Sequence, residues 1–410
     1  MTATTSINAP PAGKVSETLK NFVRWLDKYG ESSWDHQSYF AGPFGRRAKQ
    51  LYYKQKWLGT AVVAPMIFSE AFFPSARRLF HHKMRLPIAD AHYAMGFAFL
   101  HEATGRAEHL ERAVHFLEVL KATRSPGFAN YCWGYPFDWV TRNGVLKIHT
   151  PFITTTPYAF EALAHVDRLA PRDEWKEMMA SAVRYATDDI KDQPYPGGGN
   201  TCSYLPGQEF NVVNASSYRA AMLVGAAKIF GNNEWPNIAA ANVDFVLAAQ
   251  NPDGSWPYAK DGVRDFVDHF HTCFVMKGLA KIYQAARDRR IFVALAKGVD
   301  YYTAHLFAAD GMPRPFSKAP RLTVYQCELY DCAECINLCL LLRHDFPQLE
   351  KTLATVVSGI LENWVKPDGS FRSRRLKFGW DNVPMHRWAQ SQMFRALAFY
   401  LRQTVTQEAR

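Results

Sequence analysis

A short pattern of aromatic and small apolar residues recurs six times along the chain, about every 60 residues. The copies begin at His92, Pro157, Ser217, Thr272, Ala333 and Gln392. A period of this length leaves room for two helices in each unit and is longer than that of most solenoid repeats. The pattern therefore predicts a closed ring of helical hairpins, in which all loops of one kind lie on the same rim.

Apolar residues at helical spacing predict a second helix in five of the units. These predicted helices cover residues 107–122, 175–190, 235–249, 291–306 and 349–364. We therefore predict an all-α (α/α)6 toroid of helical hairpins with long rim loops. It is expected to be a single domain of residues 16–410, with the N-terminal segment helping to close the ring. Residues 1–15 are predicted to be a disordered tail, because Ser, Thr, Ala and Pro dominate this end of the chain.

Two of the predicted second helices end in the same turn. Residues 250–256 read Gln-Asn-Pro-Asp-Gly-Ser-Trp, and residues 366–371 read Lys-Pro-Asp-Gly-Ser-Phe. Proline stops the helix, and Asp-Gly forms a tight turn with a positive φ at glycine. We expect the aromatic residue that follows to pack back onto the helix end, which is a structural role.

The chain carries a net charge of +10, and 48% of its 410 residues are hydrophobic. No basic run with interleaved aromatics is present, so no nucleic-acid partner is expected. Two interpretations of this positive charge remain equally open. The basic face binds an anionic polymer, or it is solvated and has no partner. The apolar stretch of residues 61–73 is interrupted by Pro65 and Glu70 and is too short to span a bilayer. We expect a cytoplasmic protein without membrane insertion, and its oligomeric state stays open.

The sequence predicts no cofactor and no metal site. It contains neither a P-loop nor a dinucleotide-binding glycine motif. Cys332, Cys335 and Cys339 fall on one face of a predicted helix near Ile336 and Leu340, which favours core packing over metal binding.

The first candidate catalytic group is the run Asp268-His269-Phe270-His271, which lies just before a predicted first helix. A carboxylate beside an imidazole can orient it and raise its basicity, so Asp268, His269 and His271 are candidate acid/base residues. Helix capping with packing is the main alternative, and metal binding is a lesser one.

A second candidate group is Glu328, Asp331 and Glu334, spaced by three residues where the fifth first helix begins. Close carboxylates repel one another and raise one pKa, which suits a general acid. Ordinary acidic enrichment at a helix N-terminus is the alternative interpretation.

A third group surrounds the aromatic block of residues 133–139. Trp133, Tyr135 and Trp139 offer flat faces for sugar rings, and Asp138 and the downstream His149 add polar groups. An aromatic cluster that packs the ring wall is the alternative.

The remaining candidates lie in two other rim loops. Arg387 can hold a carboxylate or sulfate in its guanidinium fork, and Asp381 can act as an acid or base. An internal salt bridge is the alternative role for Arg387. The further predicted ligand contacts are Trp388, Gln390, Tyr204 and Asn214, and Tyr204 can also donate a proton.

The turn at residues 250–256 resembles the one repeated in squalene cyclases and related α/α toroids. Residues 132–139, 268–272 and 387–392 together look like bacterial α/α-toroid proteins encoded with polysaccharide biosynthesis genes. Those proteins are loosely similar to the helical domain of glucuronyl C5-epimerases and to six-hairpin glycosidases. The resemblance covers about residues 85–405 and implies the toroid fold.

The leading functional hypothesis is a carbohydrate-active enzyme that acts on an anionic, uronic-acid-containing glycan by epimerisation, elimination or hydrolysis. Proton removal beside a carboxylate needs a cation, for which Arg387 is the candidate. Hydrolysis needs two carboxylates, for which Asp138 with Asp268 or Glu328 is the candidate pair. The alternatives are a non-catalytic glycan-binding or scaffold protein and, with less support because an Asp-x-Asp-Asp motif is missing, a terpene-cyclase-like toroid.

Overall fold

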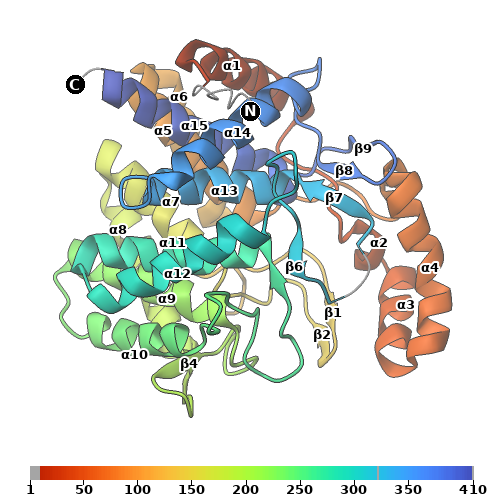
Figure 1. Cartoon of the computed structure of the whole chain (residues 1–410), viewed down its shortest axis with the longest axis horizontal. Helices are drawn as coiled ribbons and strands as arrows, with labels where there is room; N and C mark the ends of the chain where they lie inside the picture. The colour runs from red at the N-terminus through yellow and green to blue at the C-terminus, as the bar shows by residue number, and fades with distance from the viewer. Residues whose placement is uncertain (1–9, 321–322, 409–410) are drawn as a thin grey trace, which may run out of the picture.

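The computed structural model describes residues 10–320 and 323–408, and six of its helices form a closed inner ring. Each inner helix packs against the next one, and the last packs against the first (Figure 1). In chain order they are α5 (Pro87–Thr104), α7 (Thr156–Leu169), α9 (Val213–Phe230), α11 (His269–Ala286), α13 (Leu329–Leu342) and α15 (Ser391–Glu408).

A second ring of helices covers the first. It consists of α6 (Ala107–Ala122), α8 (Asp173–Arg184), α10 (Trp235–Ala248), α12 (Arg289–His305), α14 (Gln348–Asn363) and α1 (Ala12–Tyr29). A π-helical turn, Tyr185–Asp189, extends α8. Six inner and six outer helices make the (α/α)6 toroid, so the predicted fold class is confirmed.

The N-terminal helix α1 takes the sixth outer position. In the Asp-Gly turn after α10, a Cβ on Gly254 would lie 2.3 Å from a backbone oxygen of α12. In the equivalent turn after α14, a Cβ on Gly369 would lie 2.5 Å from the Asn21 oxygen of α1. Both glycines have φ of +91°, as predicted for these turns. Each turn thus packs against the outer helix that comes next in the ring. The turn after α10 contacts α12, and the turn after α14 contacts α1 in the same way, so α1 is an outer helix.

The predicted helices agree with the structure to within a few residues at their ends. The predicted tail was too long, because α1 already begins at Ala12. An apolar stripe at Val15, Leu19, Phe22 and Leu26 is buried in the core and holds this helix in place. Residues 1–9 of the predicted tail lie outside the described residues.

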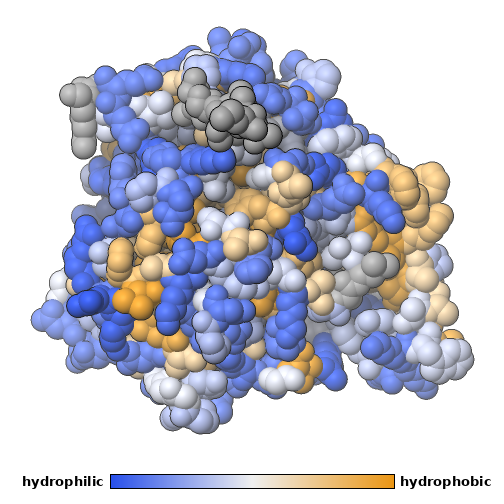
Figure 2. All heavy atoms as spheres, viewed as in Figure 1, coloured by the Kyte–Doolittle hydropathy of each residue, from blue (hydrophilic) through white to orange (hydrophobic). Residues whose placement is uncertain are grey.

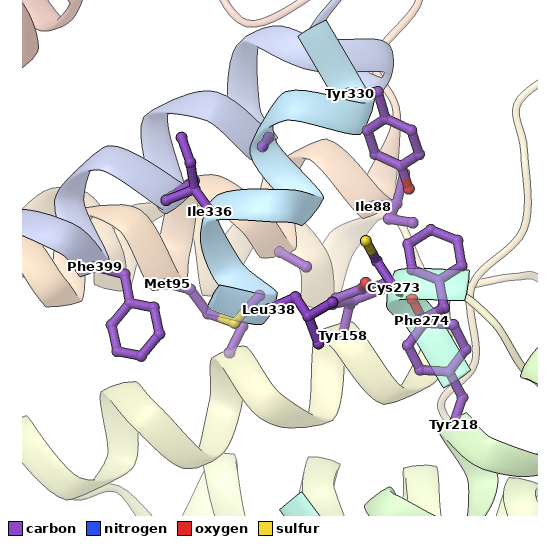
Figure 3. Close-up of a cluster of buried hydrophobic side chains, with 14 of the residues drawn as sticks. Ile88, Met95, Tyr158, Tyr218, Cys273, Phe274, Tyr330, Ile336, Leu338 and Phe399 are labelled. Atoms are coloured by element: carbon purple, nitrogen blue, oxygen red, sulfur yellow. Dashed lines mark hydrogen bonds between the residues drawn. The ribbon is translucent and has the colours of Figure 1, made fainter. Parts of the chain in front are cut away.

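Burial explains which helices are inner and which are outer. In α13 every residue from Leu329 to Leu340 is buried, whereas α14 buries one stripe that includes Leu349, Leu353 and Ile360. A helix that is apolar all round needs neighbours on all sides, and an amphipathic helix needs them on one side only. Figure 3 shows inner-helix side chains such as Met95 and Leu338 filling the space between these helices.

The long loops that lead into the inner helices carry short antiparallel strands. Three are two-stranded pairs: β1 (Trp139–Thr141) with β2 (Gly144–Leu146), β3 (Asp192–Pro194) with β4 (Asn200–Cys202), and β5 (Val267–Asp268) with β6 (Phe316–Lys318). The fourth sheet has the order β7 (Tyr325–Glu328), β8 (Arg374–Leu376), β9 (Trp380–Asp381). These strands place the rim residues at the N-terminal ends of the inner helices.

A helical insertion between α1 and α5 has no counterpart in the predicted repeat. It contains α2 (Ser38–Ala41), α3 (Pro43–Lys54), α4 (Lys56–Phe72) and a 3-10 turn, Pro74–Leu79. The antiparallel pair α3–α4 stands beside the ring, next to the β1–β2 loop (Figure 1). Within the described ranges, none of the helices, α4 included, has the length and apolarity to cross a membrane.

Close approach of α9 and α11 depends on a glycine, which leads to a stability prediction. A Cβ on Gly278 would lie 2.1 Å from Ser217 Oγ, which donates a buried hydrogen bond to Val275 O. We expect Gly278→Ala to lower the free energy of unfolding by about 1–3 kcal/mol, because the two helices must separate. In the matched change Gly225→Ala, the new Cβ would lie 3.8 Å from the Phe160 ring, which is ordinary contact. This variant should instead stabilise α9 by about 0.5–1 kcal/mol. Thermal and urea unfolding of both variants measures the difference, and equal effects would contradict the close-packing argument.

Candidate active site

A cavity of about 590 Å³ opens at the rim where the inner helices begin. This volume lies within the usual range for small-molecule sites. Residues at or next to the start of every inner helix line it: Ile88, Tyr158, Asn214, Tyr218, Phe270, His271, Tyr330, Arg387 and Trp388. Rim loops and α3 complete the wall. The ring therefore collects side chains from six repeats around one space.

His271 and Asp268 form a hydrogen-bonded pair at the edge of this cavity. Asp268 is the N-cap of α11 and accepts from the His271 backbone N–H at 3.0 Å. Its other oxygen lies 2.6 Å from His271 Nδ1. The Asp268 side chain is 2% exposed and His271 is 20% exposed, so the carboxylate lies behind the ring. This contact orients the imidazole, and in the described part of the chain no hydrogen-bond acceptor or donor occupies its Nε2.

Two tyrosine hydroxyl groups meet at the inner-helix end of the cavity. Tyr158 Oη and Tyr218 Oη are 2.5 Å apart, and Lys277 Nζ donates to Tyr158 Oη at 3.2 Å. Lys277 in turn forms a buried ion pair with Glu334. Burial raises the pKa of both tyrosines well above the usual value, so both hydroxyls keep their protons at neutral pH. Figure 3 shows Tyr218 close to Phe274 and on the same side of the helices as Tyr330.

Arg387 lies on another side of the cavity and is held by Asp35. Its Nε and Nη2 donate to the two Asp35 oxygens at 3.0 and 2.6 Å, and its guanidinium lies 4.4 Å from the centre of the Tyr135 ring. Burial of Asp35 is outweighed by the Arg387 charge, which holds the pKa of this carboxyl well below its usual range. The pair fixes the orientation of the guanidinium.

An aromatic wall joins the two sides of the cavity. Trp388 stacks on Tyr330 with ring centres 4.5 Å apart and lies 5.5 Å from Phe270, the neighbour of His271. On its other side Trp388 contacts the His36 ring at 4.6 Å. Burial lowers the pKa of His36 well below its usual range, so this imidazole is neutral. Flat faces with polar groups between them are the surface that sugar rings need.

The structure brings seven of the residues predicted from the sequence into the cavity lining. They are Tyr135, Trp139, Tyr204, Asn214, His271, Arg387 and Trp388. Asp268 stands directly behind His271. Tyr204 accepts a hydrogen bond from Thr154 Oγ1 at 3.1 Å, and Asn214 Oδ1 is buried without a partner among the described residues.

Three predicted catalytic carboxylates instead form ion pairs outside the lining. Asp138 pairs with Arg46, and Glu328 is buried against Arg374. Asp381 lies 2.7 Å from Arg77, and both side chains are fully buried. The arginines neutralise these carboxylates within the protein, and their predicted catalytic roles stay predictions.

The other predicted residues also lie outside the lining. Trp133 is fully buried and donates from Nε1 to Leu120 O at 2.8 Å, and His149 stands in the β2–α7 loop with a φ of +64°. His269 is buried, and its Nε2 lies 2.8 Å from Tyr302 Oη. Gln390 makes two hydrogen bonds to the Phe371 backbone. Burial with the Glu328 charge nearby raises the pKa of Asp331 well above its usual range, the direction expected for one member of that acidic group. Both Asp331 carboxylate oxygens are buried, and neither has a hydrogen-bond partner in the part of the chain that the structure describes.

Tyr158, Tyr218 and His36 are among the lining residues that sequence reasoning missed. Tyr158 and Tyr218 occupy the second position of two successive repeat copies, and that shared position was the signal that could have identified them. His36 comes from the loop after α1, outside the repeat, and no pattern in the sequence pointed to it.

No three His, Cys, Asp or Glu side chains in the described part of the chain are placed to hold a metal ion together. The cysteines are all buried and none forms a disulfide. Cys332, Cys335 and Cys339 pack inside the hydrophobic core, as their helical spacing predicted.

The chain shares its fold with solved structures of carbohydrate-processing proteins. A cellobiose 2-epimerase from Bacillus thermoamylovorans matches with a TM-score of 0.61 and 8% identity, over 77% of this chain and 88% of that one. A polysaccharide lyase matches with a TM-score of 0.59 and 11% identity, over 97% and 98%. An unsaturated glucuronyl hydrolase from Streptococcus agalactiae matches with a TM-score of 0.57 and 9% identity, over 96% and 92%. No family model and no curated protein sequence matches the chain. These likenesses confirm the α/α-toroid fold that the sequence resemblance implied.

Proposed function

We propose that this protein is a carbohydrate-active enzyme that removes a proton from a ring carbon of an anionic glycan. The observation that carries the proposal is the Asp268–His271 pair, whose imidazole faces a cavity lined with aromatic rings. The toroid fold is used by an epimerase, a lyase and a hydrolase that act on carbohydrates, which supports this class of substrate. A cytoplasmic location of the protein and a role in polysaccharide biosynthesis stay sequence-based expectations.

His271 is the proposed base. Its Nδ1 is engaged by Asp268, so its Nε2 carries the lone pair available to the ligand. When Nε2 takes a proton, the adjacent carboxylate stabilises the imidazolium that forms. In a uronic acid the proton to be removed is the one at C5, beside the carboxylate.

Tyr218 is the proposed proton donor. Lys277 donates to Tyr158, and if Tyr158 donates to Tyr218, the Tyr218 proton is left directed at the ligand. Return of a proton to C5 on the opposite face gives the epimer. Donation to the oxygen leaving C4, with breakage of that C–O bond, gives the unsaturated elimination product. Both outcomes use the same two groups of the protein.

The charges around the cavity favour an anionic ligand. Four Lys or Arg side chains and two carboxylates line it: Lys49, Arg142, Arg264 and Arg387 against Glu209 and Asp261, and Asp35 behind the lining pairs with Arg387. The N-terminal ends of the inner helices point toward the same rim, and their dipoles add partial positive charge. A cation stabilises the charge that a uronic acid carboxylate gains when C5 is deprotonated.

Hydrolysis has less support from this geometry. It needs two carboxyl groups on either side of the glycosidic bond. The two carboxylates of the described lining, Glu209 and Asp261, both pair with Arg264. The earlier candidates Asp138 and Glu328 pair with arginines outside it.

Incubation of the purified protein with uronic-acid oligosaccharides in deuterated water tests the proposal. We expect deuterium at C5, detected by mass spectrometry and NMR. Chains of unchanged length identify an epimerase, and a new unsaturated end identifies a lyase. Cleavage with addition of water and no C5 exchange would contradict the proton-removal step. Binding without any exchange or cleavage would favour the glycan-binding alternative.

A further inference from the structure

The α3–α4 pair carries an apolar surface that nothing in the described chain covers. The inner side of α4 buries Gly59 against the Tyr52 backbone of α3, and it buries Met66 in a small core with Tyr39 and Ala48. The outer side presents Trp57, Ala61, Ala64, Phe68 and Phe72, which follow one another at helical spacing. A helix that is apolar on both sides normally has partners on both sides.

Neighbouring segments extend this surface, which we name the α4 face. Its large apolar residues are Trp57, Phe68, Phe72, Phe73, Leu79 and Phe378, with exposed fractions from 46% to 86%. Phe378, from the β8–β9 turn, stacks on Phe72 with ring centres 6.0 Å apart. Figure 2 shows hydrophobic atoms gathered at the right edge of the molecule, where Figure 1 places α4.

The segment that forms this surface holds most of the protein's net charge. Residues 43–83 contain eight Lys or Arg and one acidic residue, Glu70, a net charge of +7 in a chain whose total is +10. At the α3–α4 turn, Lys54 and Lys56 come just before the 78%-exposed Trp57. In the described structure Arg47, Lys54 and Lys56 have no ion-pair partner.

We propose that the α4 face docks on the surface of a lipid bilayer that contains anionic headgroups. Apolar and aromatic side chains that enter the headgroup region, flanked by Lys and Arg, are how helices bind in the plane of an interface. The contact involves one leaflet only, because α4 has 17 residues interrupted by Pro65 and Glu70. A second copy of the chain is a poorer occupant, since a symmetric dimer through this face would place Arg47, Lys54 and Lys56 of one copy against the same residues of the other.

Docking in this way places the cavity beside the membrane. Lys49 and Tyr53 of α3 line the cavity wall, and α4 packs along the other side of α3. The cavity mouth would then lie next to the headgroups. This inference is independent of the reaction proposed above, because it concerns another surface and is measured without a glycan.

Vesicle flotation tests the proposal with the full-length protein. We expect it to float with phosphatidylcholine vesicles containing about one third phosphatidylglycerol and to remain behind with pure phosphatidylcholine, and added salt should release it. Phe68→Ser with Phe72→Ser should weaken vesicle binding at least about tenfold. Lys54→Glu with Lys56→Glu should weaken it by about tenfold or more.

Matched variants on other surfaces serve as controls. Ile229→Ser removes an equally exposed apolar side chain from α9, and Lys351→Glu reverses an exposed charge on α14. Both should bind vesicles like the wild type, and circular dichroism should show that all variants fold. Absence of wild-type binding to anionic vesicles would overturn the proposal. So would a dimer in sedimentation equilibrium that Phe68→Ser with Phe72→Ser dissociates while vesicle binding is missing.

Discussion

Replacement of His271 by alanine should lower the rate of C5 proton exchange by about 10²–10⁴-fold. The variant removes the base but leaves the aromatic wall and Arg387 in place, so KM for an active uronic-acid substrate should change little. Deuterium incorporation followed over time by mass spectrometry gives the rate. Added imidazole should restore part of it, because a small base can occupy the space left by the side chain.

Two comparisons separate this role from a structural one. Asp268→Asn keeps an oxygen for the α11 cap but loses the charge that orients His271, so its rate should also fall while KM stays similar. His149→Ala, which changes a histidine outside the cavity lining, should keep the wild-type rate. A His271→Ala enzyme that is folded and fully active would remove His271 from the mechanism.

Replacement of Asp381 by asparagine should lower the free energy of unfolding by about 3–5 kcal/mol. The change leaves the fully buried Arg77 without its nearest carboxylate, because Glu70 is 3.8 Å away and Met385 offers only sulfur. The pair joins the insertion between α1 and α5 to β9, so its loss should destabilise both segments. Urea and thermal unfolding measure the effect.

A surface ion pair provides the matched control. Asp244→Asn removes a carboxylate from Arg290, whose side chain is 62% exposed, and should cost no more than about 1 kcal/mol. Turnover per folded molecule should be unchanged in Asp381→Asn, because Asp381 does not line the cavity. Loss of turnover at wild-type stability would instead support the catalytic role predicted from the sequence.

Local patterns in the sequence predicted the structural features that depend on residues close together in the chain. The helices of the ring follow from apolar spacing within each segment, and the Asp268–His271 contact follows from a helix cap with its partner three residues on. The cavity position was also predictable, since repeated units place equivalent loops on one rim.

Pairings between distant segments were not predictable in this way. The partner of Asp381 lies in the insertion, at Arg77, and the partner of Arg387 is Asp35 after α1. Asp381 looked like a candidate acid or base because the sequence shows its charge but not the arginine that neutralises it. The insertion itself was missed because its apolar stretch follows no repeat and was weighed only as a possible membrane span.

The position of α1 in the ring has a consequence for how the protein is made. The inner ring closes between α5 and α15, where a Cβ on Gly96 would meet the Phe394 ring at 2.6 Å. Tyr400 Oη also donates to Pro10 O at 3.2 Å, so the two ends of the described chain lie together. During translation the sides of α1 and α5 that pack against α15 therefore stay uncovered until α15 has left the ribosome. The nascent chain must be kept from aggregating for almost the whole of its synthesis, and folding is completed only after that helix emerges.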